Sequence, residues 1–304
     1  RDLGGADHGL VVAQEEGLIE GPRLVICGKA LTVTGGHADL RRRHDDRPGM
    51  MSDRLGSMGV IADGVDTARA ACRQQIKHGA QFIKVMANGG VSSPNDPIHV
   101  LQYSMDELRA MVEEAAMAGT YVAAHLYTDP AIRRCVAAGV HSLEHCNLIE
   151  PETAAAAAAA GCIAVPTLVA YEALARHGKA PGLGPAAFAK IEVVRAGGLR
   201  SLAIMRDAGL PMAFGTDLLG ALRRHAGLEW SLRAAVLSPL EILQAATVTG
   251  ARLCGMAARI GTLAPGAEAD VIAVAADPLA DIAAMGDPAN IRLVVSGGRI
   301  VKGG

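Results

Sequence analysis

The sequence predicts an α/β fold, in which a parallel barrel of strand–helix units is followed by a small β segment. Short apolar runs alternate with longer amphipathic stretches, a pattern typical of βαβ units. Half of the 304 residues are hydrophobic but only 3% are aromatic, so the chain can bury a large aliphatic core. Glycine follows four helical patterns directly before a strand, where a left-handed helix end favours it; these are Gly119, Gly139, Gly161 and Gly209.

The expected elements follow one another regularly along the chain. Apolar runs predict strands at 23–33, 81–86, 121–124, 142–143, 162–165 and 212–214. Helical patterns lie at 64–78, 104–118, 130–138, 150–160, 185–208 and 222–236. Ser104 and Glu107 have the spacing of a capping box at the start of one helix. After about residue 260 the pattern changes, and 269–274, 291–295 and 299–301 predict β-strands.

Charge and cysteine content narrow the classes of function. The formal net charge is −2, which gives no electrostatic case for binding nucleic acid or an anionic membrane. The six cysteines show no CxxC spacing, and scattered thiols favour a reducing, cytoplasmic compartment. No apolar stretch reaches the roughly 18 residues of a membrane span. We therefore expect a small-molecule or dipeptide substrate as the partner, with homo-oligomerisation left open.

Lys84 lies inside an apolar run that predicts a buried parallel strand. Because a buried, unpaired ammonium is very costly, one interpretation is a lysine paired with a buried carboxylate, and another is a strand at the edge of the sheet. A third is that burial deprotonates the lysine, which then reacts with CO₂ to give a carbamate. Such a carbamate is effectively a carboxylate and can bridge two metal ions.

Three more polar residues end apolar runs, where parallel barrels place their active sites. His125 and His145 end successive runs, which predicts that both imidazoles reach one rim. A lone histidine at such a place is more often a packed core residue, but two in succession favour ligands. Asp217 ends a later run, where a helix cap is the alternative interpretation. With Lys84, these residues form a ligand set that suits Zn²⁺ or a similar divalent ion.

His37 and Tyr127 are candidate substrate-binding residues near this rim. Either side chain could hold a substrate carboxylate or polarise a carbonyl. A simple loop histidine and a rim tyrosine are equally consistent with the sequence.

Several segments resemble the amidohydrolase superfamily, in particular its prolidase-like, imidazolonepropionase-related branch. They are FIKVMANGGVSSPNDP, TGGHAD, AAHLYT, SLEHCNLI, PTLVAYEAL, FGTDLLG and the stretch from ATVTGARLCGM to DPL. The likeness covers essentially the whole chain. It implies two divalent metal ions, expected to be Zn²⁺, bridged by a carbamate on Lys84. It further implies that His125 and His145 bind one ion and Asp217 the other.

The resemblance also implies a mechanism. Asp217 would take the proton of a metal-bridging hydroxide and pass it to the leaving amine, while His37 and Tyr127 hold the terminal carboxylate of the substrate. The metal lowers the pKa of bound water, and a nearby carboxylate serves as acid and base.

One family feature is missing from the sequence, the His-x-His pair of the first barrel strand. We therefore expect a (βα)₈ TIM-like barrel that lacks its first strands at 1–258, and the C-terminal part of a small β-sandwich domain at 259–304. An N-terminally truncated barrel has unpaired edges, so we expect weak or no catalysis from these residues alone.

Three functions remain open at this point. The first is a metallo-dipeptidase that cleaves Xaa-Pro or similar dipeptides. The second is hydrolysis of a cyclic or aryl amide, such as an imidazolone or a mycotoxin amide. The third is a non-catalytic structural relative that has lost its metals. The retained Lys84, His125, His145 and Asp217 argue against the third.

Overall fold

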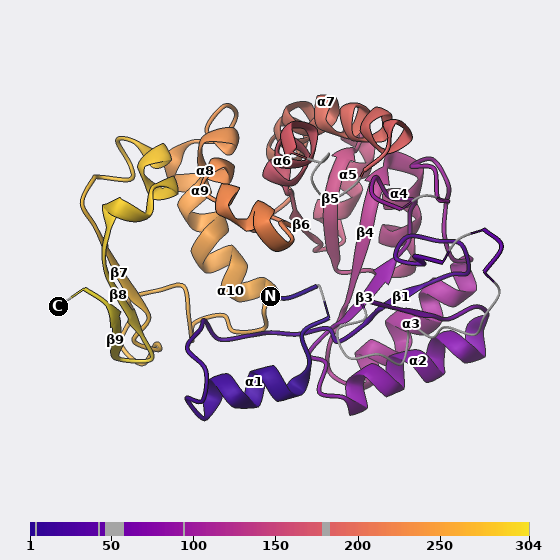
Figure 1. The fold of residues 1–304 in the computed structure, drawn as a ribbon, viewed down its shortest axis with the longest axis horizontal. Coiled ribbons are helices and arrows are strands. Elements are labelled where there is room, and N and C mark those ends of the chain that lie inside the picture. The colour runs from indigo at the N-terminus through magenta and orange to yellow at the C-terminus, as the bar shows by residue number, and fades with distance from the viewer. Residues whose placement is uncertain (4, 42, 46–57, 94, 178–182, 304) are drawn as a thin grey trace. The chain divides into compact units, whose positions relative to one another are not determined.

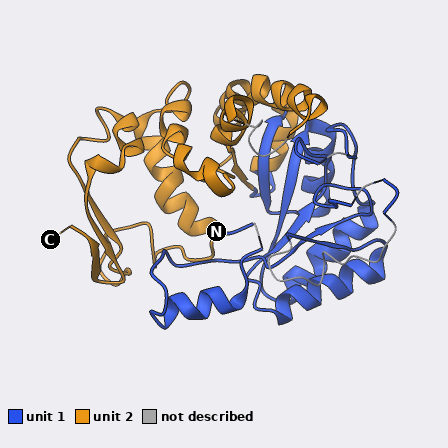
Figure 2. Ribbon diagram, viewed as in Figure 1, with its two compact units in different colours: residues 1–149, 159–162 blue, residues 150–158, 163–304 orange. Residues whose placement is uncertain are grey.

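The computed structural model of the chain describes residues 1–3, 5–41, 43–45, 58–93, 95–177 and 183–303. The fold is α/β, with a six-stranded parallel sheet and a separate three-stranded antiparallel sheet (Figure 1). The chain forms two compact units (Figure 2). Unit 1 comprises Arg1–Ile149 and Ala159–Cys162, and unit 2 comprises Glu150–Ala158 and Ile163–Gly304. Barrel closure and the domain boundary at 258/259 stay predictions.

Five parallel strands form the centre of unit 1 in the order β2-β1-β3-β4-β5. They are β1 (Ala30–Thr32), β2 (Gly59–Ile61), β3 (Ile83–Met86), β4 (Val122–Thr128) and β5 (Ser142–Leu148). Every residue of β1 and β3 is buried, as expected for strands that are covered on both faces. The predicted strand at 23–33 is wrong in extent, because Gly28 turns the backbone at φ 64° and only Ala30–Thr32 joins the sheet.

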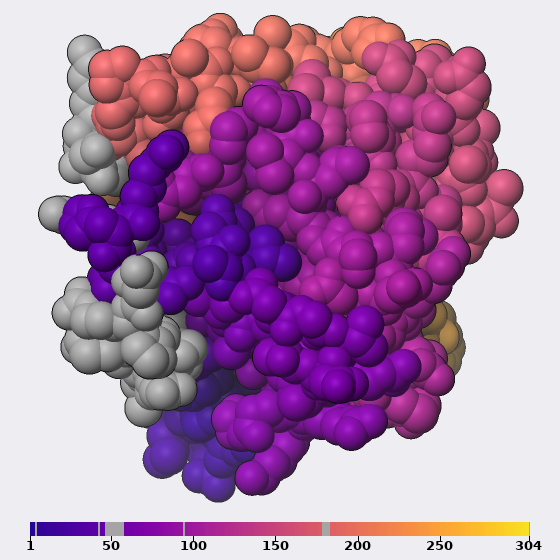
Figure 3. Space-filling model, turned by 90° about the vertical axis from the view of Figure 1, so that its right-hand side faces the viewer, coloured from indigo at the N-terminus to yellow at the C-terminus, as the bar shows by residue number. Residues whose placement is uncertain are grey.

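Helices α2 (Val65–Lys77), α3 (Met105–Met117) and α4 (Asp129–Ala138) flank these strands (Figure 1). The segments that contain them form much of the molecular surface in Figure 3. The buried positions of α2 recur every three or four residues, so one face packs inward; they are Ala68, Ala71, Cys72 and Gln75. Unit 1 also contains α1 (His8–Glu15), which the sequence patterns did not indicate.

The predicted helix ends of unit 1 are confirmed. Ser104 accepts a hydrogen bond from the backbone N–H of Glu107, whose side chain binds the N–H of Ser104 in return. This reciprocal pairing satisfies two backbone donors at the start of α3. Gly139 ends α4 at φ 92°, a conformation that glycine adopts without a steric penalty.

Unit 2 is mostly helical, with a β segment at its C-terminal end. Its larger elements are α5 (Pro151–Ala159), β6 (Ile163–Val165), α6 (Leu168–His177), α7 (Pro185–Asp207), α8 (Leu228–Arg233) and α9 (Pro239–Gln244). Shorter ones are η1 (Gly220–His225), η2 (Ala245–Thr249), α10 (Gly250–Leu253), η3 (Ile282–Gly286) and η4 (Pro288–Asn290). Ala159, the last residue of α5, clusters with unit 1.

Two predictions for unit 2 are wrong in extent. The predicted strand at 212–214 makes one parallel bridge, between Met212 and Ala164. Ala213 N–H still donates to the carbonyl of Ala164, but the pairing ends there. Phe214 N–H donates to Ala245, and the Ala213 carbonyl accepts from Arg233. The predicted helix at 222–236 splits into η1 and α8.

Gly227 lies at this split. A Cβ at position 227 would lie 2.1 Å from the carbonyl oxygen of Gly286, so the backbones of two segments meet closely there. The close approach requires a glycine at the junction of η1 and α8.

The C-terminal β segment is confirmed. Strands β7 (Val271–Val274), β8 (Ile291–Ser296) and β9 (Arg299–Lys302) pair antiparallel in that order. Gly297 and Gly298 connect β8 to β9 with φ of 54° and 79°, as a tight hairpin turn requires.

All six cysteines of the chain are free thiols. In the part of the chain that the structure describes, no helix has both the length and the apolarity to cross a bilayer.

Candidate metal and substrate site

Two imidazoles and a phenol ring converge on the neighbouring strands β4 and β5. The rings of His125 and His145 lie 4.8 Å apart between centroids and are steeply inclined at 70°. Tyr127 contacts both, with centroid distances of 4.7 Å to His125 and 5.4 Å to His145. We expected each histidine to end its strand. Instead, β4 continues beyond His125 to Thr128, and β5 continues beyond His145 to Leu148.

Lys84 lies on the adjacent strand β3 and is only 3% exposed. Parallel pairing places it opposite Ala123, two residues before His125 on β4. The strand is internal, between β1 and β4, so the interpretation of Lys84 as an edge-strand residue is wrong. The sheet therefore brings Lys84, His125 and His145 onto three consecutive strands, β3, β4 and β5.

The two histidines of the site are buried beside Lys84. Burial holds the pKa of His125 well below its usual range, and the neighbouring His37, His145 and Lys84 lower it further. Burial likewise lowers the pKa of His145, with Lys84 as the next cause. Both rings are therefore neutral at physiological pH, which is the form that offers a nitrogen lone pair to a metal ion.

The backbone in the middle of β5 is unusual. His145 and the following Cys146 have φ of 71° and 57°, in the left-handed region that non-glycine residues rarely adopt. Each such residue costs on the order of 1 kcal/mol, and such costs are typical of functional sites. The register between β4 and β5 also shifts between Leu126 and Thr128. Together these irregularities set the directions of the Tyr127 and His145 side chains.

The loop between β3 and α3 supports the site through Asn88, which is fully buried. Its amide nitrogen donates to the carbonyls of Ile98 and Val100, both at 2.8 Å. Its oxygen accepts the backbone N–H of Tyr127 at 2.9 Å, so it ties the loop to β4. No pattern in the sequence pointed to this role of Asn88.

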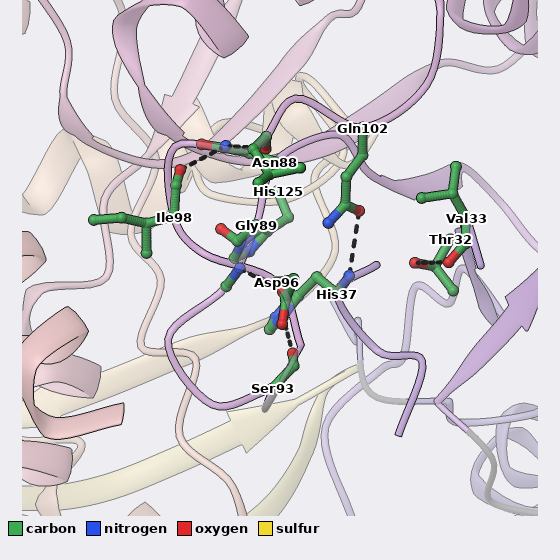
Figure 4. Close-up of polar contacts among 12 residues, drawn as sticks. Thr32, Val33, His37, Asn88, Gly89, Ser93, Asp96, Ile98, Gln102 and His125 are labelled. Carbon is green, nitrogen blue, oxygen red and sulfur yellow. Dashed lines mark hydrogen bonds and ion pairs between the residues drawn. The ribbon is translucent and has the colours of Figure 1, made fainter. Parts of the chain in front are cut away.

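His37 joins the site from the turn after β1. Its ring stacks on that of His125, with centroids 4.2 Å apart and an interplanar angle of 22°. Figure 4 shows it beside two residues of the β3–α3 loop, Ser93 and Asp96. Its Nδ1 lies 2.5 Å from Ser93 Oγ and 3.2 Å from Asp96 Oδ2. The two candidate substrate-binding residues, His37 and Tyr127, therefore both lie against His125, one of the predicted metal ligands in unit 1.

Asp217, the remaining predicted ligand, belongs to unit 2 and is exposed. Its φ is 49°, again in the left-handed region. The N-cap of the following η1 is Leu219, so Asp217 does not occupy the cap position that we considered for it. Its predicted role as ligand and proton carrier stays a prediction.

The donor types of unit 1 suit a divalent metal in part. Among the described residues, no group of three or more His, Cys, Asp or Glu side chains is arranged to hold an ion. Two neutral imidazoles are present, and Lys84 supplies an oxygen ligand only as a carbamate. The chemistry of these donors fits a metal site to which the lysine contributes in modified form.

The family profile for amidohydrolases matches residues 1–301. The chain belongs to the amidohydrolase family. This amidohydrolase is 35% identical over 313 residues to an ochratoxinase of Aspergillus niger, which it matches along its whole length. It spans 65% of the length of that relative.

Solved structures agree with this membership. A prolidase complexed with N-methylphosphonate-L-proline superposes on this amidohydrolase with a TM-score of 0.98 at 45% identity, covering 100% of this chain and 75% of the prolidase. A Xaa-Pro dipeptidase with methionine bound in its active site gives a TM-score of 0.87 at 28% identity, covering 97% and 72%. The predicted resemblance to the prolidase-like branch is therefore confirmed.

Proposed function

We propose that this amidohydrolase is a metal-dependent hydrolase of amide C–N bonds whose substrates are Xaa-Pro or similar dipeptides. The observation that carries the proposal is the convergence of Lys84, His125 and His145 on consecutive buried strands, with both imidazoles neutral. The amidohydrolase family typically binds divalent metals, and the similar prolidase was solved with a proline derivative.

Each residue has a role in this proposal. Lys84, carboxylated at Nζ by CO₂ with loss of a proton, would supply carbamate oxygens as ligands for two divalent ions, expected to be Zn²⁺. His125 and His145 would hold one ion, and Asp217 the other. Bound ions would lower the pKa of water and polarise the scissile carbonyl. Asp217 would accept a proton from the attacking water and deliver it to the leaving nitrogen.

The substrate is held by its free carboxylate. His37 and Tyr127 lie against His125 and are the nearest candidates for this contact. Burial of the surrounding side chains strengthens each polar contact, because little water competes for it. A dipeptide with a blocked C-terminus would lose this anchor.

A second candidate function is the hydrolysis of an aryl amide. The 35% identity to an ochratoxinase favours it. The two candidates differ in the group next to the scissile nitrogen, and the same ions and proton carrier would serve both. Homo-oligomerisation and the lack of a nucleic-acid partner stay predictions.

The test uses the complete polypeptide that contains this chain, purified and loaded with Zn²⁺. Bound metal is measured by plasma mass spectrometry, and hydrolysis is followed for an Xaa-Pro dipeptide panel and for aryl amides of amino acids. We expect about two ions per chain, by the family resemblance, and the highest kcat/KM for Xaa-Pro dipeptides. Preference for aryl amides would move the conclusion to the second candidate. Absence of bound metal would exclude both.

A further inference from the structure

The β3–α3 loop contacts His37 in a way that the proposed roles leave unexplained. His37 lies 59 positions from Asp96 in sequence, yet its Nδ1 meets both Ser93 Oγ and Asp96 Oδ2. Asp96 is buried, with a side chain that is 1% exposed, whereas His37 is 15% exposed. A buried carboxylate needs polar partners to offset the loss of water, so its place beside His37 calls for an explanation.

The Asp96 carboxylate and the Ser93 hydroxyl hold the His37 ring by the same nitrogen. Both lie within hydrogen-bond distance of its Nδ1. The same oxygen, Oδ2, accepts the backbone N–H of Gly90 at 2.6 Å, which fixes the carboxylate in place. With Nδ1 occupied, Nε2 is the ring nitrogen that remains for a substrate.

Gly90 adds a steric constraint on the same ring. A Cβ at this position would lie 1.9 Å from His37 Nδ1, far inside van der Waals contact. His125 stacks on the His37 ring at 4.2 Å. The imidazole is thus confined by a neighbouring ring and by the loop backbone, and its nitrogen is fixed by Asp96 and Ser93 (Figure 4).

We propose that Asp96 and Ser93 are positioning residues that orient His37 so that its Nε2 meets the terminal carboxylate of the substrate. This inference rests on the proposed function, because it takes His37 as the carboxylate-binding residue. The β3–α3 loop therefore determines specificity for substrates with a free C-terminus.

The test compares Ala-Pro with its C-terminal amide, Ala-Pro-NH₂, on the zinc-loaded complete polypeptide. Asp96→Ala is expected to lower kcat/KM for Ala-Pro by roughly 10- to 100-fold, mainly through KM, the size expected for a hydrogen bond to a charged group. Hydrolysis of the amide should be unchanged. Asp96→Asn keeps an acceptor at the same place and should recover part of the loss. Gly90→Ala should reproduce the Asp96→Ala pattern by displacing the ring.

Asp63→Asn is the matched control. Asp63 accepts from the backbone N–H and the hydroxyl of Thr34, so it supports the turn that carries His37. These bonds go to Thr34 and not to the His37 ring, so the substitution should leave the ratio of the two substrates unchanged. A loss with this variant equal to that of Asp96→Ala would show a general effect on the turn and overturn the inference.

A second readout does not depend on activity. Nitrogen-15 NMR of the histidine side chains, with the His37 signals identified by their loss in His37→Ala, reports the surroundings of its two ring nitrogens. We expect the His37 signals of Asp96→Asn to stay close to those of the parent protein and those of Asp96→Ala to shift. Unchanged His37 signals in Asp96→Ala would overturn the inference.

His37→Ala separates the two levels of the argument. If this variant keeps the parent's preference for Ala-Pro over the amide, His37 does not bind the carboxylate, and the proposed substrate contact and the inference both fail. If it loses the preference while Asp96→Ala keeps it, the inference alone fails.

Discussion

At the scale of single residues, the site depends on two histidines that their surroundings keep neutral. Burial is the largest cause of the lowered pKa values of His125 and His145. Lys84 adds to the effect in both, since a positive charge nearby disfavours protonation of a ring. If Lys84 becomes an anionic carbamate, the charge beside the two imidazoles changes from positive to negative. The lysine can then serve as a metal ligand together with them.

Lys84→Met tests this role. The substitution keeps the unbranched stem and removes the nitrogen, so the core should stay filled while the bridging ligand is lost. We expect metal bound after dialysis to fall from about two ions per chain to one or none, as measured by plasma mass spectrometry. Thermal unfolding of the metal-free protein should be little changed.

The control for this variant is Lys77→Met, at the exposed end of α2. It removes a lysine that lies outside the site, and its metal content should equal that of the parent. Parent-like metal binding in Lys84→Met would show that the lysine carries no ligand.

At the scale of secondary-structure elements, unit 1 depends on how its helices pack along the sheet. Helices α2 and α3 are joined by Glu114, which is buried and accepts hydrogen bonds from two arginines of α2. The bonds measure 2.8 Å from Arg69 Nη1 and 2.8 Å from Arg73 Nε. Hydrogen bonding to Arg73 is the largest cause that lowers the pKa of Glu114, with a further contribution from Arg69, while burial opposes them.

The sign of this shift predicts how stability depends on pH. A carboxyl whose pKa is lower in the folded state stabilises the fold above its unfolded pKa, and the contribution is lost as pH falls through the folded pKa. Glu114→Gln should therefore lower the free energy of unfolding at pH 7 by about 1–2 kcal/mol. This value lies between the contribution of an exposed ion pair and that of a buried hydrogen bond to a charged group. Urea denaturation should show the difference shrinking as pH falls below the ordinary range of a glutamate.

Glu113→Gln provides the comparison, since Glu113 is 60% exposed and pairs with the same Arg69. Its effect at pH 7 should be smaller than that of Glu114→Gln. A penalty for Glu114→Gln that stays constant down to acid pH would contradict the electrostatic explanation.

At the scale of the whole molecule, unit 2 has its own buried ionic centre. Arg233 and Glu229 are both fully buried and meet at 2.7 Å. Arg233 also donates to the carbonyls of Pro166 at 2.6 Å and Ala213 at 3.1 Å, so it connects α8 with the segments after β6 and before Asp217. The guanidinium lies over the Phe214 ring, 4.7 Å from its centroid.

Breaking this pair should cost far more than removing it. Arg233→Met leaves the Glu229 carboxylate buried without its cation, and we expect a loss of about 3–5 kcal/mol in the free energy of unfolding. The double variant with Glu229→Met removes both charges and should be clearly more stable than the single variant. Chemical denaturation of both variants measures the difference. Equal losses would mean that the carbonyl contacts of Arg233, rather than the ion pair, hold this part of unit 2 together.

The α/β class, most strands and helices, and the local signals that end them could be predicted from the sequence. The capping box of Ser104 and the left-handed Gly139 depend only on neighbouring residues, so a pattern along the chain is sufficient to find them. The alternation of apolar and amphipathic segments reports which faces are buried. It also placed Lys84, His125 and His145 on successive strands.

Only the tertiary structure decided which side chains meet across long separations. His37 stacks on His125, and Asp96 fixes the His37 ring, because the β1 turn and the β3–α3 loop fold over the same part of the sheet. Periodicity carries no information about such contacts, since they depend on backbone directions in segments that are distant in sequence. For the same reason the sequence could not show that Gly227 meets Gly286, or that Arg233 takes the carbonyl of Ala213 from a predicted strand.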